Sequence, residues 1–239
     1  MSKMSTDLTR HALNGATMGT RWSALFYAPR GFDPAPLQIA LQAAVDQVDA
    51  QMTTWRPDSD LMRLNAAPLN AWVLVPRPLM AVLATGLQVG RATGGAFEIA
   101  MGDAITAWGF GPAEADTDRI KAARLKPRRP SFDSLELDVA NGLARKHDAS
   151  TFDLSGIAKG YGVDRLAETL QAHGIAEGLV AIDGEVRALG CQTDGTAWPV
   201  AVEAPDRQAR AVHSMLALQD AAVATSGDYR HWVQVGERL

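Results

Sequence analysis

The stretch GLVAIDGEVRALG, residues 178–190, decides the fold class. Its two apolar runs are joined by Asp183 and Gly184, a pair that favours the tight two-residue turn of an antiparallel hairpin. Just upstream, residues 158–173 place apolar side chains at helical spacing, and Gly174 suits the position after a helix C-terminus. We therefore expect a helix followed by an antiparallel hairpin in this part of the chain.

Outward from this hairpin, helices are expected mostly upstream and strands mostly downstream. The expected helices are residues 34–52, 58–65, 76–93 and 102–108. The expected strands are residues 14–29, 198–204, 215–220 and 222–226, and residues 112–150 are expected to be loop-rich with short strands. Helices that cluster first and strands that cluster later predict an α+β fold, with a largely antiparallel sheet flanked by helices.

Composition and charge exclude several classes of protein. With 239 residues and 47% hydrophobic content, the chain can bury a sizeable core, and its single cysteine excludes an internal disulfide. The net charge of -4 argues against a general nucleic-acid binder. The one basic cluster, residues 121–129, is broken by apolar residues and is expected to be a solvated loop after a short helix.

The N-terminal residues indicate no export signal. They lack an apolar signal region, a cleavage site and a lipobox, and no apolar run approaches the ~20 residues of a transmembrane helix. As written, the chain is therefore expected to be cytoplasmic and without a transmembrane segment.

Four segments are richer in glycine, small polar residues and carboxylates than a core requires. They are residues 15–20 (GATMGT), 93–98 (TGGAFE), 153–160 (DLSGIAKG) and 224–229 (ATSGDY). The third precedes a helix, where free N–H groups suit a phosphate and Lys159 adds a cation, although the spacing is neither that of a P-loop nor G-x-G-x-x-G. Taken singly, each segment also fits an ordinary turn, cap or strand end, so both interpretations stay open.

The polar residues offer few other chemistries. The five histidines have no metal-ligand spacing, which argues against zinc, so any metal is expected to be a hard cation such as Mg²⁺ held by oxygen ligands. Thr225 and Ser226 are conceivable nucleophiles, but no histidine lies next to them in sequence to activate them.

The four segments, together with MTTWRPDSD at residues 52–60 and RLN at 63–65, resemble the FAD:protein FMN transferase (ApbE) family from about Gly15 to Tyr229. The resemblance implies one ApbE-like flavin-transferase domain over residues 1–239. It implies a Mg²⁺-dependent transfer of FMN from FAD to a Thr or Ser hydroxyl of a target flavoprotein, with release of AMP. Family members are often exported to the periplasm or anchored to the inner membrane.

The resemblance also implies a set of binding residues. The expected FAD contacts are Met18, Trp55, Ala96, Phe97, Glu98, Asp153 and Lys159, and the carbonyl of Gly156 is expected to help bind Mg²⁺. This chain departs from the family where Glu98 and Ile99 replace the usual Asp and Pro. It departs again where Asp183 and Glu185 flank Gly184 in place of a commoner Gly-Gly-Asp pattern.

The family's proton-accepting histidine and the Asp and Thr of its metal site would fall beyond Leu239. The catalytic residue is therefore unknown, and the resemblance implies that this chain lacks the C-terminal part of the domain, binds FAD weakly or not at all, and is nearly inactive. Two alternatives remain open at this point. One is an FAD-binding or delivery protein for maturation of a respiratory flavoprotein or reductase, and the other is an inactive structural or interaction domain.

Overall fold

The computed structural model describes residues 8–206, 209 and 211–227, and these divide into two compact units. The first unit comprises the described residues up to Gln47 and from Lys159 onward. The second unit comprises Val48–Ala158. The expectation of one flavin-transferase domain over residues 1–239 stays a prediction.

The first unit is built on a five-stranded sheet with the order β1-β2-β6-β7-β10. Its strands are β1 (Leu8–Thr17), β2 (Thr20–Pro29), β6 (Gly178–Ile182), β7 (Glu185–Leu189) and β10 (Ala222–Ala224). Every neighbouring pair is antiparallel, and Ile182 pairs with Glu185 across the two-residue turn that the sequence predicts. The antiparallel α+β class is thereby confirmed.

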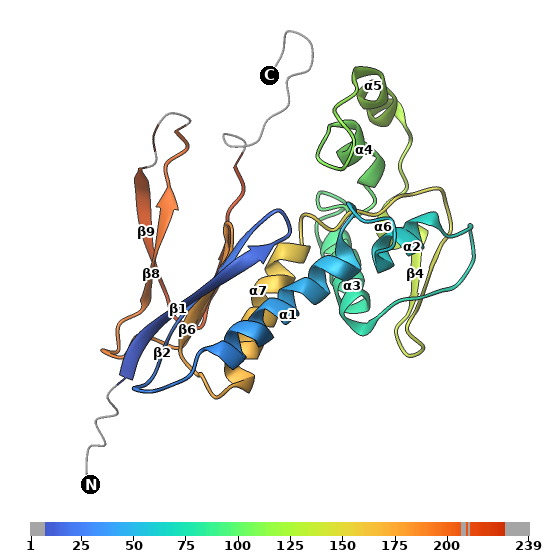
Figure 1. The fold of residues 1–239 in the computed structure, drawn as a ribbon. Helices are drawn as coiled ribbons and strands as arrows, with labels where there is room; N and C mark the ends of the chain where they lie inside the picture. The colour runs from blue at the N-terminus through green and yellow to red at the C-terminus, as the bar shows by residue number, and fades with distance from the viewer. Residues whose placement is uncertain (1–7, 207–208, 210, 228–239) are drawn as a thin grey trace. The chain divides into compact units, whose positions relative to one another are not determined.

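Helices α1 (Ala35–Met52) and α7 (Ala158–Ala172) pack on one face of this sheet (Figure 1). The apolar stripes of both helices are buried in the core together with alternate residues of β2 and β6. The core includes Leu37, Leu41 and Val45 of α1, Val163, Leu166, Ala167 and Leu170 of α7, and Trp22, Ala24, Phe26, Val180 and Ile182 of the sheet. The indole N–H of Trp22 donates to Gln42 Oε1 at 2.9 Å, which ties α1 to β2.

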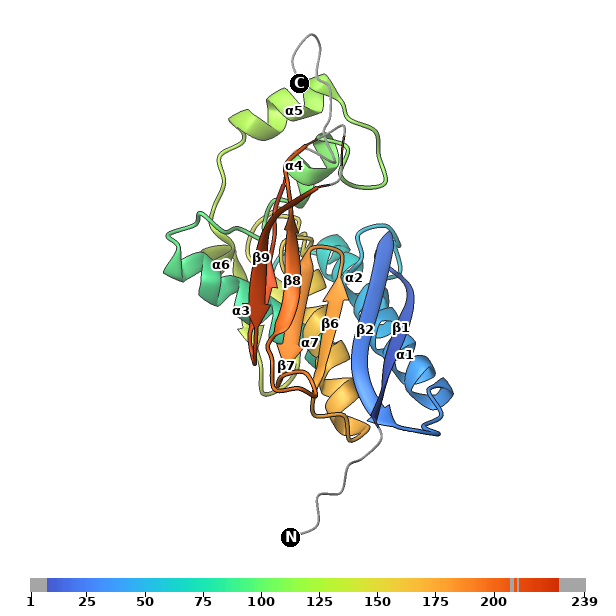
Figure 2. The same ribbon diagram turned by 90° about the vertical axis from the view of Figure 1, so that its left-hand side faces the viewer.

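A two-stranded ribbon, β8 (Trp198–Glu203) and β9 (Val212–Leu218), packs on the other face of the same sheet (Figures 1 and 2). Trp198 is 2% exposed and belongs to one apolar cluster with Leu25, Tyr27 and Leu179. These residues alternate along β2 and β6 with the residues of the helix-covered face, as the two-residue period of a strand requires.

The second unit combines a small sheet with short helices. It contains α2 (Asp60–Ala66), β3 (Val73–Leu74), α3 (Arg77–Ala92), α4 (Gly102–Ala107), α5 (Thr117–Leu125), α6 (Ser131–Ser134), β4 (Leu135–Asp138) and β5 (Leu143–Lys146). The sheet order is β3-β5-β4. Ser59 caps α2 by accepting from Met62 N at 3.1 Å, and Gly86 and Gly90 let α3 approach its neighbours closely. Among the described residues, no helix has the length and apolar character needed to cross a membrane.

The prediction of a single opening strand at residues 14–29 is wrong, because β1 and β2 form a hairpin there. Met18 and Gly19 form its turn, with φ of 44° and 72°. A two-residue hairpin turn of this kind favours positive φ, which Gly19 adopts readily and Met18 does not. The hairpin was not predicted because the Asn-Gly or Asp-Gly pair that normally marks such a turn is missing.

The prediction of a loop over the basic cluster, residues 121–129, is wrong for its first part. Lys121 and the residues to Leu125 form the second half of α5, and only the rest of the cluster follows as a loop. Helix α5 begins at an N-cap, where Asp116 Oδ1 accepts from Arg119 N at 2.8 Å. It buries Ile120 alone, so it shows no apolar periodicity from which a helix could be predicted.

Candidate functional site

The predicted FAD- and Mg²⁺-binding residues fall in both units. Met18 and Lys159 lie in the first unit. Trp55, Ala96, Phe97, Glu98, Asp153 and Gly156 lie in the second unit.

In the first unit, Met18 lies at the tip of the β1–β2 hairpin and packs against α7. A Cβ built on Gly162 would lie 3.1 Å from Met18 Cε and 2.8 Å from Ile182 Cδ1, so the absence of a side chain there makes room for both. A non-glycine residue at φ 44° is strained, and such strain is typical of residues held in place for a function.

Lys159, three residues before Gly162 on α7, is held by two carboxylates of the β6–β7 hairpin. Its Nζ lies 3.2 Å from Asp183 Oδ2 and 3.2 Å from Glu185 Oε2. Burial alone would lower the pKa of Lys159, but the two carboxylates outweigh burial and raise this pKa above its ordinary value. Lys159 is therefore charged at neutral pH and fixed in position, with its charge already offset within the first unit.

The end of β10 closes over the same hairpin. The backbone N–H and the Oγ1 of Thr225 both donate to the carbonyl oxygen of Gly184, each at 3.2 Å. The hydroxyl of Thr225 is thus engaged in holding the turn, which favours a structural role over that of a nucleophile. Asp228 and Tyr229 of the same predicted segment lie outside the described residues.

In the second unit, the loop that follows α3 is shaped by Thr93 and two glycines. Thr93 Oγ1 accepts from Phe97 N at 3.1 Å and donates back to Val89 O at 2.9 Å. Gly94 and Gly95 adopt φ of 61° and 86°, which a residue with a side chain would resist. The loop therefore turns sharply and presents Ala96, which is exposed, and Phe97, which is half-buried.

Glu98 uses both carboxylate oxygens within its own unit. Oε1 accepts from Ala100 N at 2.8 Å and Oε2 accepts from Ser131 N at 2.9 Å. This arrangement fastens the loop to the start of α6. A side-chain contact between Glu98 and FAD stays a prediction, and it would compete with these two hydrogen bonds.

Two segments far apart in sequence lie side by side and bring Asp153 close to this loop. Asp153 N donates to Ile99 O at 2.9 Å, and Gly102 N donates to Thr151 O at 2.9 Å. Further along, a Cβ built on Gly156 would lie 3.3 Å from Phe97 Cε2, so the ring packs against the glycine backbone. Phe97, Glu98, Asp153 and Gly156 thus form one cluster.

Asp153 carries a buried carboxylate that can accept further hydrogen bonds. The residue is 5% exposed, and its Oδ1 accepts from Ser155 N at 2.8 Å. In the part of the chain that the structure describes, no cation lies within ion-pair distance of it. A buried carboxylate is costly unless it is hydrogen-bonded, so Asp153 is suited to accept from an N–H or O–H of a ligand. Trp55, by contrast, is 63% exposed and offers an open aromatic surface.

Metal-ligating side chains do not cluster among the described residues. Among them, no three or more His, Cys, Asp or Glu side chains gather where they could hold a metal ion. Gly156 can offer only its carbonyl oxygen.

Comparison with known proteins identifies the family of this chain. The sequence model of the ApbE family matches residues 18–239. The chain belongs to the ApbE family. It is 35% identical over 225 residues to the FAD:protein FMN transferase of Vibrio cholerae, which covers 93% of this chain and 67% of that protein. It is also 32% identical over 239 residues to the FAD:protein FMN transferase of Haemophilus influenzae, covering 95% of this chain and 69% of that protein.

Solved ApbE structures agree with the fold. The flavin transferase ApbE from Vibrio cholerae superposes with a TM-score of 0.81 at 30% identity, covering 95% of this chain and 74% of that one. The apo form of the flavinyl transferase ApbE from Pseudomonas stutzeri gives a TM-score of 0.79 at 32% identity, covering 94% and 71% of the two chains. The ApbE-like α+β fold expected from the sequence is confirmed.

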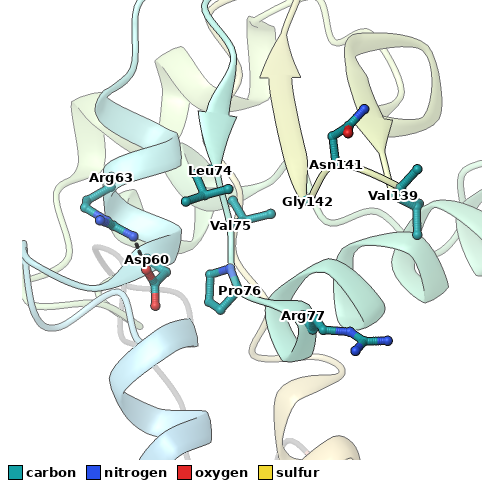
Figure 3. Close-up of a pocket in the computed structure, with 10 residues that line it drawn as sticks. Asp60, Arg63, Leu74, Val75, Pro76, Arg77, Val139, Asn141 and Gly142 are labelled. Atoms are coloured by element: carbon teal, nitrogen blue, oxygen red, sulfur yellow. Dashed lines mark hydrogen bonds and ion pairs between the residues drawn. The ribbon is translucent and has the colours of Figure 1, made fainter.

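One open groove in the second unit lies apart from the predicted ApbE site residues. Its volume is about 790 Å³, and α2, β3, the start of α3 and the β4–β5 turn line it (Figure 3). Arg63 and Asp60 pair with each other at one side, and Leu74 and Val139 present apolar surface. None of the predicted FAD contacts lines this groove.

Two polar residues that support the segment of Asp153 were not predicted from the sequence. Asn65 hydrogen-bonds to Phe152, and Lys146 hydrogen-bonds to Asn65. The sequence gives Asn65 a place in the RLN motif but no role, and it indicates no role for Lys146. The signal for Lys146 is its place in the short strand LARK, where alternation puts Ala144 and the lysine on the same, buried side. Lysine at an inward position of a strand indicates a buried acceptor for it.

Proposed function

We propose that this protein transfers FMN from FAD to a Thr or Ser hydroxyl of a target flavoprotein, with release of AMP. The observation that carries the proposal is membership of the ApbE family over residues 18–239, a range that includes both site clusters. The relatives named FAD:protein FMN transferase match 93% and 95% of this chain, so the likeness is not confined to one unit.

The chemistry is a phosphoryl transfer. The hydroxyl oxygen of the target attacks the phosphorus of the FMN half, and a phosphoester bond forms. The bond from that phosphorus to the bridging oxygen breaks, and AMP leaves with that oxygen, while the hydroxyl proton passes to a base. Such a reaction gains mainly from positioning and from groups that stabilise charge on the phosphate oxygens.

The described residues fit the binding part of this reaction. Met18 and Phe97 offer polarisable and aromatic contacts to the flavin ring, and Asp153 offers a buried carboxylate to a ligand donor. Lys159 is a cation of fixed position at the start of α7. The residue that takes the hydroxyl proton is not assigned among the described residues.

Magnesium dependence is the finer part of the proposal. A pyrophosphate substrate suits Mg²⁺, which normally takes only one or two protein carboxylates and completes its coordination with water and phosphate oxygens. The carbonyl of Gly156 is the position that we propose for a protein ligand. When bound, the ion would neutralise charge on the pyrophosphate.

A flavin-transfer assay tests the proposal. The protein is incubated with FAD and a flavoprotein target, with Mg²⁺ or with EDTA. Mass spectrometry of the target then detects an FMN ester on Thr or Ser, and chromatography measures AMP. The near-inactivity that the resemblance implies is one outcome of this assay, seen as little or no ester and AMP. Where transfer occurs, we expect the ester and AMP in equal amounts, and we expect EDTA to abolish both.

Two results would contradict this function. If AMP and free FMN appear without a modified target, the protein is an FAD hydrolase. If FAD binds and no AMP is released under any condition, the protein binds flavin without transfer chemistry.

A further inference from the structure

Resting on the proposed function, we infer that Asn65 and Lys146 are positioning residues that hold the segment carrying Asp153 in its FAD-binding geometry. Both lie in the second unit with Asp153. Neither is among the residues predicted to contact FAD, and each acts through the backbone next to that carboxylate.

The side chain of Asn65 clamps the residue directly before Asp153. Its Nδ2 donates to Phe152 O at 2.9 Å, and its Oδ1 accepts from Phe152 N at 2.7 Å. The amide thus replaces a neighbouring strand, because it satisfies both backbone groups of one residue. Asp153 N in turn donates to Ile99 O, so Phe152 and Asp153 are each hydrogen-bonded to a different partner.

This clamp lies at a buried place. Phe152 is 0% exposed and Asp153 is 5% exposed. Leaving backbone groups unpaired at such a place is unfavourable, so the loop would rearrange if the amide were removed. Because the carboxylate follows the clamped residue directly, a rearrangement there moves Asp153.

Lys146 holds the other side of Asn65. The lysine is 5% exposed, and its Nζ donates to Asn65 O at 2.5 Å. That carbonyl belongs to the last turn of α2, where carbonyl groups lack helical partners and the helix dipole favours a cation. Among the described residues, Lys146 has no carboxylate within ion-pair distance.

A buried lysine without a paired carboxylate is costly, and burial accordingly lowers the pKa of Lys146. The cost is offset where the ammonium group satisfies the end of α2 and thereby fixes Asn65. Four residues form a chain of contacts, in which Lys146 holds Asn65, Asn65 holds Phe152, and Phe152 directly precedes Asp153.

The test is a double-mutant cycle in FAD affinity, measured with the whole protein by fluorescence titration. Asn65→Ala, Lys146→Met and Asp153→Asn are each expected to weaken FAD binding on the order of tenfold or more, because a small misplacement of a contact group has effects of this size. In the Asp153→Asn background, the Asn65 and Lys146 changes should add less than about threefold, since they act through that carboxylate.

Stability measurements separate positioning from a merely structural role. Urea unfolding should show the same loss of stability for Asn65→Ala with and without the Asp153→Asn change. The loss of FAD affinity, in contrast, should appear only where Asp153 is intact. Asn65→Asp serves if the alanine variant does not fold, because it keeps the size of the side chain and the acceptor for Phe152 N. Asn141→Ala and Lys126→Met are matched controls in the same unit, and their FAD affinity should equal that of the unaltered protein.

Additive losses of affinity in the two backgrounds would overturn the positioning role, as would unchanged FAD affinity in folded Asn65→Ala and Lys146→Met. In either case the proposed function stands as long as the unaltered protein binds FAD and transfers FMN. If the unaltered protein itself binds no FAD, the proposed function fails and this inference fails with it.

Discussion

At the scale of single residues, two glycines of α7 provide a matched pair. Gly162 makes room for Met18 and Ile182, whereas a Cβ on Gly160 would meet nothing within 4 Å. We expect Gly162→Ala to cost about 1 kcal/mol through overpacking and to displace Met18, the predicted flavin contact. Gly160→Ala should be neutral or stabilising by up to about 1 kcal/mol, since alanine is the better helix former.

Urea unfolding and FAD titration of the two variants check this expectation. Weaker FAD binding by Gly162→Ala alone supports Met18 as a flavin contact. Equal affinities for the two variants would mean that Met18 does not touch the flavin.

At the scale of elements, Asp103 ties α4 to the segment that follows α5. Its carboxylate accepts from Arg128 Nη1 at 2.6 Å and from Lys126 Nζ at 2.9 Å. Burial raises the pKa of Asp103, but the hydrogen bonds from Arg128 and Lys126 outweigh burial, so the pKa lies below its ordinary value of 3.8. This tie therefore contributes stability above pH 3.8, and the contribution is lost as pH falls through the lowered pKa.

We expect Asp103→Asn to lower the free energy of unfolding by about 1–2 kcal/mol at neutral pH, and to speed hydrogen exchange in α5. The difference from the unaltered protein should vanish in acid. Asp118→Asn is the control, because Asp118 also pairs with a lysine, Lys121, but its side chain is 93% exposed to solvent. A difference that persists below the lowered pKa would assign the effect to packing and not to charge.

The elements that could be predicted from the sequence are those with one apolar stripe or a strong turn pair. Helices α1, α3 and α7 and the β6–β7 hairpin follow from such local patterns. Helix α5 could not be predicted, because it is polar on nearly every side and depends on its Asp116 cap. The β1–β2 turn was missed because Met18 occupies a conformation that sequence statistics assign to glycine, asparagine or aspartate.

The candidate site is harder to predict, because its contacts join segments distant in sequence. The pairing of Ile99 with Asp153 and the clamp of Asn65 on Phe152 depend on tertiary folding and leave no periodic signal. The resemblance to the ApbE family predicts which residues contact FAD. It did not predict that both carboxylate oxygens of Glu98 are used by backbone N–H groups, nor that Lys159 is held by Asp183 and Glu185.

At the scale of the whole molecule, the predicted flavin contacts are divided between the two units, and this division can be tested without a transfer assay. A ligand that binds the folded protein at 100 times its Kd stabilises it by about 2.7 kcal/mol, and it slows hydrogen exchange most where it makes contacts. If one FAD uses both sets of residues, FAD should protect amides around Met18 and Lys159 as well as those around Phe97 and Asp153. AMP alone should protect fewer of them, because it lacks the flavin ring. Protection confined to one unit would restrict the FAD contacts to that unit and remove the other unit's residues from the binding site.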